Sequence, residues 1–200
     1  MAISEVSICN QALMNLGANP IISLDDDTTE AKICKVFYEP IRNVLLETNN
    51  WTFTIQWLNL AQAASPPLSE FANAFPLPVD ASRVLFVGEN YERPNRKWQV
   101  EGNNIVTDEI TCKAQVVILE TDPNKYSAAF IQALVARLSA DMAIALTNSR
   151  SLFETHMQIF NMKLQEAIST DNLQGKTRRI RSRWLQDARW SGAPTAGPYV

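Results

Sequence analysis

Apolar positions in the last third of the chain recur at intervals of three and four residues, the spacing of one helical face. After the turn-forming run Asp122-Pro123-Asn124, the first such stripe consists of Ile131, Leu134, Val135, Leu138, Met142 and Leu146. Asn148 and Ser149 interrupt the pattern, and Ser149 can cap a second helix. The second stripe consists of Phe153, Met157, Phe160, Leu164 and Ile168. Together the stripes predict an antiparallel helical hairpin between about residues 126 and 171.

The same spacing predicts two more helices near the start of the chain. Ser4 can cap the first, and Gly17 is suited to end it. The second should run from about Thr28 to Thr48, with Asp27 and Glu30 as a D-x-x-E capping box. Its inward face should carry Ala31, Cys34, Phe37, Tyr38, Ile41, Val44 and Leu45. Pro40 deletes the hydrogen bond to the carbonyl of Val36, so a kink or a break is expected there.

Between the two helical regions the hydrophobic period changes to two, which is typical of strands. The alternation begins at Trp51 and continues through Phe53, Ile55 and Trp57. Further strand-like runs cover residues 84–87, 98–100, 105–107 and 114–119. Gly102-Asn103-Asn104 predicts a hairpin turn, because glycine and asparagine tolerate a positive φ.

These elements predict an α+β fold, in which helix pairs from the two ends of the sequence form a bundle and a small antiparallel β-sheet is inserted between them. The expected parts are an N-terminal helical part (1–50), an inserted β-rich part (51–122), a helical hairpin that completes the bundle (123–171) and a basic, flexible tail (172–200). A hydrophobic content of 46% is enough for a core. No run of eighteen apolar residues and no signal-peptide pattern is visible, so we expect the protein to be made in a cytoplasm.

Charge is distributed unevenly. The net charge is −3, but residues 172–200 hold six basic residues against one acid, for a net charge of +5, which leaves −8 on residues 1–171. Arginine and tryptophan are residue types that anchor interfaces, and the tail carries both. The tail is therefore the candidate partner-binding segment, through Lys176, Arg178, Arg179, Arg181, Arg183, Trp184, Arg189 and Trp190.

Candidate chemistry is sparse, and we expect no catalytic residue, cofactor or metal. Cys9, Cys34 and Cys112 are odd in number and far apart in the sequence, which favours reduced, small apolar residues over disulfides or a zinc site. The run Asp25-Asp26-Asp27 lacks the spacing of a calcium loop. His156, the one histidine, is expected to be packed or solvated. Convergence of carboxylates into a glycan hydrolase site stays open for Glu30, Glu39, Glu47, Asp108 and Glu109.

The order of several short motifs resembles the tail tubular protein A family of short-tailed bacteriophages, over about residues 4–171. The motifs are Ala12-Leu13-x-x-Leu16-Gly17-x-x-Pro20-Ile21-x-Ser23-Leu24, Arg42-x-x-x-Leu46, Trp51-x-Phe53, Phe75-x-Leu77-Pro78-x-Asp80, Tyr126-x-x-x-Phe130 and Leu138-x-Ala140. The resemblance implies a virion adaptor, assembled in the host cytoplasm, that forms a ring of twelve copies between the portal protein and the tail nozzle (tail tubular protein B). It also implies that DNA passes through the ring during ejection. The match does not extend over residues 172–200.

The sequence is compatible with three functions. The first is the structural adaptor, with the tail becoming ordered on the portal and the acidic body letting DNA slide without specific binding. The second is a nucleic-acid-binding module, because basic residues with interleaved tryptophans can neutralise phosphates and stack on bases. The acidity of the whole chain, with a pI near 5.3, weighs against the second function. The third, a glycan hydrolase, rests only on carboxylates that the sequence cannot place.

Overall fold

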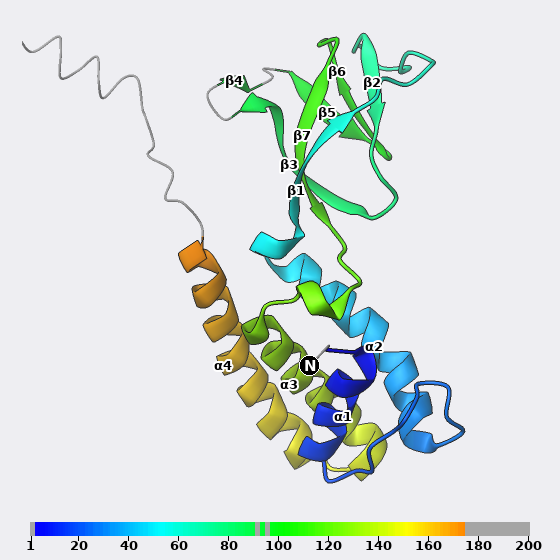
Figure 1. Ribbon diagram of the computed structural model, residues 1–200, viewed down its shortest axis with the longest axis vertical. Helices are drawn as coiled ribbons and strands as arrows, with labels where there is room; N and C mark the ends of the chain where they lie inside the picture. Colours follow the sequence, from blue (N-terminus) through cyan, green and yellow to red (C-terminus); the bar gives the residue numbers. More distant parts are fainter. Residues whose placement is uncertain (1–2, 91–92, 95–96, 175–200) are drawn as a thin grey trace, which may run out of the picture.

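Helices lie at both ends of the described chain and strands lie between them (Figure 1). The structure is a computed structural model, and it describes residues 3–90, 93–94 and 97–174. The helices are α1 (Glu5–Asn15), α2 (Thr29–Thr48), α3 (Ala128–Thr147) and α4 (Arg150–Gln174), with 3-10 turns η1 (Thr52–Thr54) and η2 (Pro123–Lys125). The strands are β1 (Ile55–Leu60), β2 (Asn73–Pro76), β3 (Ala81–Asn90), β4 (Arg93–Pro94), β5 (Trp98–Glu101), β6 (Asn104–Thr107) and β7 (Cys112–Ile118). The predicted α+β class is confirmed.

Helix α3 lies at the centre of the helical part, where α1, α2 and α4 all contact it. Small residues make these close approaches possible, because Ala133, Ala136 and Ala140 are buried at the contacts. By length and composition α3 could also cross a membrane, but 61% of its most apolar window is buried within the protein. The helical core is completed by large side chains, among them Leu13, Leu46, Trp51, Phe130, Leu134, Leu138 and Met142.

Local capping explains where the first two helices begin. Ser4 accepts a hydrogen bond from the backbone N–H of Ser7 and forms a capping box with it, so the predicted cap is confirmed. The predicted capping box of Asp27 and Glu30 is wrong. Thr28 is the N-cap of α2 instead, and its hydroxyl accepts from the N–H of Ala31 at 3.2 Å. The Thr28 hydroxyl, one residue after Asp27, accepts from a backbone N–H group in the first turn that has no partner within the helix, and the two acids take no part in the cap.

Helix α2 runs through Pro40 as one continuous element, so a break does not occur there. The carbonyl that loses its partner belongs to Val36, which is exposed, and water can therefore replace the missing donor. The prediction that Val44 points inward is also wrong, because its side chain is 65% exposed. Successive helical residues are about 100° apart, so Leu45 faces α3 while Val44 lies beyond the edge of that contact.

The strands form two antiparallel sheets rather than the single sheet that was predicted. One has the order β1-β7-β3-β4 and the other the order β2-β6-β5. Trp51 and Phe53 lie outside the strands, because η1 occupies residues 52–54 and β1 begins only at Ile55. The predicted hairpin is confirmed: Glu101 pairs with Asn104 and Gly102 has φ +59.

The sheets enclose a second hydrophobic core, separate from that of the helices. Its buried members are Phe75, Leu77, Val87, Ile105, Cys112, Ala114, Val116 and Ile118. In Figure 1 the sheets occupy one end of the described molecule and the helices the other. The two parts meet where α2 passes into β1 and where β7 passes into α3.

Candidate functional site

The eight tail residues that the sequence nominates for partner binding all lie outside the described residues. The described chain ends with α4 at Gln174. The structure therefore places none of these eight side chains. The described residues carry three notable features: the junction between the helices and the sheets, a groove on the helical part, and exposed apolar side chains on the β part.

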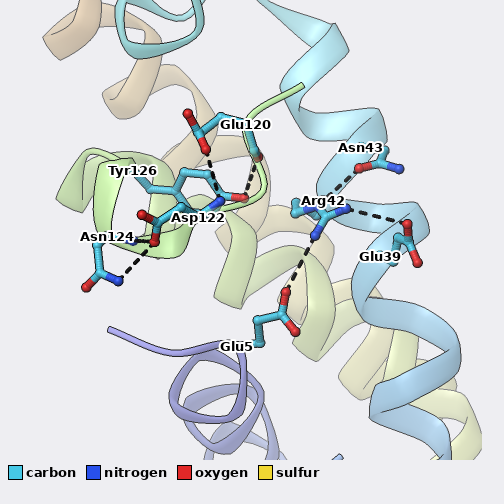
Figure 2. Close-up of polar contacts among 8 residues, drawn as sticks. All are labelled: Glu5, Glu39, Arg42, Asn43, Glu120, Asp122, Asn124 and Tyr126. Carbon is cyan, nitrogen blue, oxygen red and sulfur yellow. Dashed lines mark hydrogen bonds and ion pairs between the residues drawn. The ribbon is translucent and has the colours of Figure 1, made fainter. Parts of the chain in front are cut away.

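A buried arginine joins the first two helices on the side where the chain leaves β7 (Figure 2). Arg42 on α2 is only 6% exposed, and its guanidinium lies 3.6 Å from a carboxylate oxygen of Glu5 and 3.6 Å from one of Glu39. Its Nε donates to the Asn43 side chain at 3.1 Å. The guanidinium carbon lies 5.7 Å from the ring centre of Tyr38, at cation–π distance. Arg42 thus links α1 to α2, and burial raises the pKa of the Tyr38 hydroxyl.

A second polar group holds the connection from β7 to α3 (Figure 2). The hydroxyl of Tyr126 donates to the carbonyl of Glu120 at 2.8 Å, and burial raises the pKa of Tyr126 to about 12. The Glu120 carboxylate lies 2.7 Å from Nζ of Lys125 and accepts from the N–H of Asp122 at 3.1 Å. Burial acts to raise the pKa of Glu120, but these two donors outweigh it and the pKa is lowered. Asn124 donates to Asp122, which tightens the turn.

The far end of α4 is tied to the start of the sheets by a buried carboxylate. Asp171 is 4% exposed and accepts hydrogen bonds from the backbone N–H of Thr52 at 3.0 Å and from its hydroxyl at 3.1 Å. Next to this contact, Trp51 packs edge to face on Phe130 with 5.1 Å between ring centres. The indole N–H of Trp51 donates to the carbonyl of Leu45 at 2.9 Å. The junction is therefore fixed by both polar and aromatic contacts.

An apolar groove opens between α2, α3 and α4, with a volume of about 280 Å³. One wall carries the guanidinium of Arg137, which lies 5.3 Å from the ring centre of Phe160 and donates to Asp141 at 2.8 Å. Aliphatic side chains form most of the remaining wall. The lining consists of Pro40, Ile41, Val44, Leu45, Thr48, Arg137, Phe160 and Leu164. We call this feature the α2–α4 groove.

Large apolar side chains are exposed on the β part as well. Leu68, Val79 and Ile110 lie on loops and are among the most exposed hydrophobic residues of the described chain. Trp57 on β1 is partly exposed, contacts Phe86 edge to face, and lies 5.8 Å from Nζ of Lys113. These side chains leave apolar surface of the β part in contact with solvent.

The three consecutive aspartates, Asp25, Asp26 and Asp27, each interact with a nearby lysine or with backbone N–H groups. Asp25 pairs with Lys35 at 2.7 Å, and Asp27 pairs with Lys32. Asp26 accepts from two backbone N–H groups of the turn before it. Within residues 3–90, 93–94 and 97–174 there is no group of three or more histidine, cysteine or acidic side chains that could hold a metal ion.

The carboxylates considered for glycan hydrolysis are not brought together. Glu30, Glu39 and Glu47 occur along α2 in the helical part. Asp108 and Glu109 precede β7, whose first residue, Cys112, pairs with the last residue of β1, at the end of the strand away from the helices. His156 is buried in α4.

The three cysteines are free and buried. Cys9 and Cys34, although distant in sequence, are neighbours in the helical core, and Sγ of Cys34 lies 3.9 Å from the sulfur of Met142. The hydrogen bond with Cys34 and burial raise the pKa of Cys9, and burial raises the pKa of Cys112 to about 11. Cys9 and Cys112 are therefore held in the protonated form and act as small apolar residues, whereas the hydrogen bond with Cys9 lowers the pKa of Cys34.

The described surface thus offers an apolar groove on the helical part and exposed apolar side chains on loops of the β part. The groove was not found from the sequence, because its walls come from three helices that only the folded chain brings together. In comparisons with known proteins, the sequence matches no protein-family model and no curated protein.

Proposed function

We propose that this chain is a structural virion adaptor that forms a dodecameric ring between a portal protein and a tail nozzle. The proposal follows the resemblance of residues 4–171 to the tail tubular protein A family. In this proposal DNA passes through the ring without specific binding. The residues assigned to portal binding are those of the basic tail, from Lys176 to Trp190.

The observation that carries the proposal is that both parts of the molecule expose apolar side chains to solvent. A ring of identical subunits needs two different complementary surfaces on each copy, because each copy contacts both neighbours through a heterologous interface. The helical part offers the α2–α4 groove, and the β part offers loops with Leu68, Val79 and Ile110 exposed. Contacts between subunits through these surfaces need no catalytic side chain.

The arrangement proposed for the parts follows from the element order. We propose that α1 and α2 combine with α3 and α4 into one bundle, and that the two sheets are an insert between these pairs. Two buried contacts support this arrangement: Arg42 links α1 to α2, and Asp171 ties α4 to Thr52 at the start of the insert. A rigid junction lets a subunit span the distance from the portal to the nozzle without bending.

The charge distribution agrees with a channel lining. Residues 1–171 carry a net charge of −8. Acidic side chains facing a channel repel DNA phosphates, which lets the genome slide rather than adhere. The basic tail is suited to a different partner, because guanidinium groups pair bidentately with carboxylates on a protein surface.

Electron microscopy of the full-length protein mixed with its portal protein tests the proposal. Rings on the portal face are expected for the unchanged chain. Replacing Arg178, Arg179, Arg181 and Arg183 together by glutamate should prevent ring formation. The matched variant with lysine at the same four positions keeps the charge and should retain weaker binding, because lysine lacks the planar fork of donors.

Two results would contradict the adaptor function. One is that the protein forms no complex with the portal protein under any condition tested. The other is binding of duplex or single-stranded DNA with an affinity that falls steeply with salt, which would favour the nucleic-acid-binding module instead.

A further inference from the structure

The α2–α4 groove is an apolar recess with room for one large side chain. Its volume of about 280 Å³ lies below the usual range for sites that enclose a complete small-molecule ligand, which begins at about 300 Å³. Val44 and Phe160 provide apolar walls from two different helices. Val44 is 65% exposed, so one wall is open to solvent. An aromatic side chain inserted here would cover apolar surface that the described residues leave in water.

The rim of the groove is suited to basic residues. Glu47, one turn after Val44 on α2, is exposed and forms no ion pair with any described residue. Arg137, the cation of the lining, has its charge balanced by Asp141, with which it pairs at 2.8 Å. An occupant with an aromatic side chain and neighbouring cations would therefore fill the apolar recess and place positive charge near the Glu47 carboxylate.

The chain itself contains a segment of this composition. Residues 175–200 include Trp184 and Trp190, and they hold six basic residues against one acid. Leu164 lies ten residues before Gln174 on α4, a distance of about 15 Å along the helix axis. The ten residues from Gly175 to Trp184 span up to about 33 Å when extended. Trp184 can therefore reach the groove of its own molecule.

We propose that the α2–α4 groove is a docking site for this chain's own C-terminal segment, residues 175–200, with a tryptophan in the groove and arginines near Glu47. Docking covers the groove in the free protein and withholds the segment from other partners. The inference does not depend on the adaptor function. If the segment also binds a portal, the portal competes with the groove for it.

Limited trypsin digestion of the full-length protein, followed by mass spectrometry, measures the contact. Trypsin cleaves after lysine and arginine, and the tail offers such sites from Lys176 to Arg189. When the segment is docked, cleavage requires its release, so the rate follows the fraction released. Val44→Arg blocks the groove and repels the tail, and it should raise the cleavage rate in the tail at least about tenfold, equivalent to about 1.4 kcal/mol.

The matched control is Val36→Arg. Val36 lies on the same helix and is 68% exposed, but it does not line the groove. This control adds the same charge and the same new trypsin site, and it should leave the tail cleavage rate unchanged. The double variant Trp184→Ala, Trp190→Ala changes no described residue and should reproduce the effect of Val44→Arg.

Equal tail cleavage rates in the unchanged protein, Val44→Arg and the tryptophan double variant would overturn the proposal. Equal acceleration by Val36→Arg and Val44→Arg would also overturn it, since charge alone would then explain the result. A dilution series identifies the source of the segment. Protection that persists on dilution supports docking within one molecule, whereas protection that disappears assigns the groove to the tail of a second copy and contradicts the proposal.

Discussion

Single buried polar residues fix how the helices pack and how they connect to the β part. Arg42, Glu120 and Asp171 are each less than 9% exposed, and each has partners on a neighbouring element or turn. Buried polar groups destabilise a fold unless their hydrogen bonds are made, so the partners of these residues specify one arrangement. The junction is therefore sensitive to changes of single atoms.

Glu120 gives the junction a pH dependence that can be measured. Its pKa is lowered below the ordinary value of 4.5 in the folded state, so its contribution to stability is present above pH 4.5 and is lost as the pH falls through the lowered pKa. Glu120→Gln should reduce the free energy of unfolding at pH 7 by about 1 kcal/mol or less, since solvent screens the pair with Lys125. Urea denaturation at a series of pH values should show this difference shrinking in acid.

Glu70→Gln is the control for that series. Glu70 is exposed and has no ion pair among the described residues, so its replacement should leave the free energy of unfolding nearly unchanged at each pH. A difference between Glu120→Gln and the unchanged protein that stays constant down to the acid limit would contradict the assignment of the pH dependence to this carboxylate.

At the scale of elements, the α3–α4 hairpin depends on one residue in the left-handed conformation. Asn148 has φ +50, and its N–H donates to the carbonyl of Ile144 at 3.0 Å, which ends α3 and turns the chain into α4. Asn148→Ala should reduce the free energy of unfolding by about 1 kcal/mol, because a β-carbon without a compensating polar group disfavours this conformation.

Asn148→Gly is the matched comparison, since glycine adopts a positive φ without strain. Its effect on the free energy of unfolding should be within about 0.5 kcal/mol of zero. Because the side chain at this position is exposed, neither change alters a buried contact. Thermal or urea denaturation of the two variants would contradict this explanation if alanine and glycine gave the same stability.

Element boundaries with a local cause could be predicted from the sequence, and those with a distant cause could not. Ser4 and Gly102 act on residues next to them, so a helix start and a hairpin were predicted correctly. The division of the strands into two sheets depends on pairings between distant segments, such as β1 with β7. Val44 was misplaced because the helical period shows which residues share a face but not where the neighbouring helix ends.

The candidate sites divide in the same way. The basic tail could be proposed as a partner-binding segment from composition alone, because arginine and tryptophan are typical of interfaces. The α2–α4 groove was missed, since Val44, Arg137 and Phe160 become neighbours only after three helices pack. The role of Arg42 was also missed, because its partners Glu5 and Tyr38 come from α1 and from an earlier turn of α2.

On the scale of the whole molecule, two hydrophobic cores that share no buried residue predict two regions of separate local stability. Leu134 and Ile105 are both fully buried, one in each core. Leu134→Ala and Ile105→Ala should each reduce stability by about 2–5 kcal/mol. Hydrogen exchange should accelerate mainly in α1, α3 and α4 for the first, and mainly in β2, β6 and β7 for the second.

If either substitution accelerated hydrogen exchange equally in the helical part and in the β part, the two cores would unfold as one cooperative unit. Ala74→Gly in β2 is a mild comparison, since it removes one methyl group from a buried position of the β part. Its effect should be confined to the neighbouring strands.

The contact between Asp171 and Thr52 has a mechanical consequence. It lies in the last turn of α4, three residues before Gln174, where the C-terminal segment begins. Tension on that segment therefore reaches Asp171 almost at once, and the carboxylate passes part of the load to the start of the β part through two hydrogen bonds to Thr52. A subunit pulled by its C-terminus would bear the force across both halves in shear, instead of having α4 peeled from α3 one turn at a time.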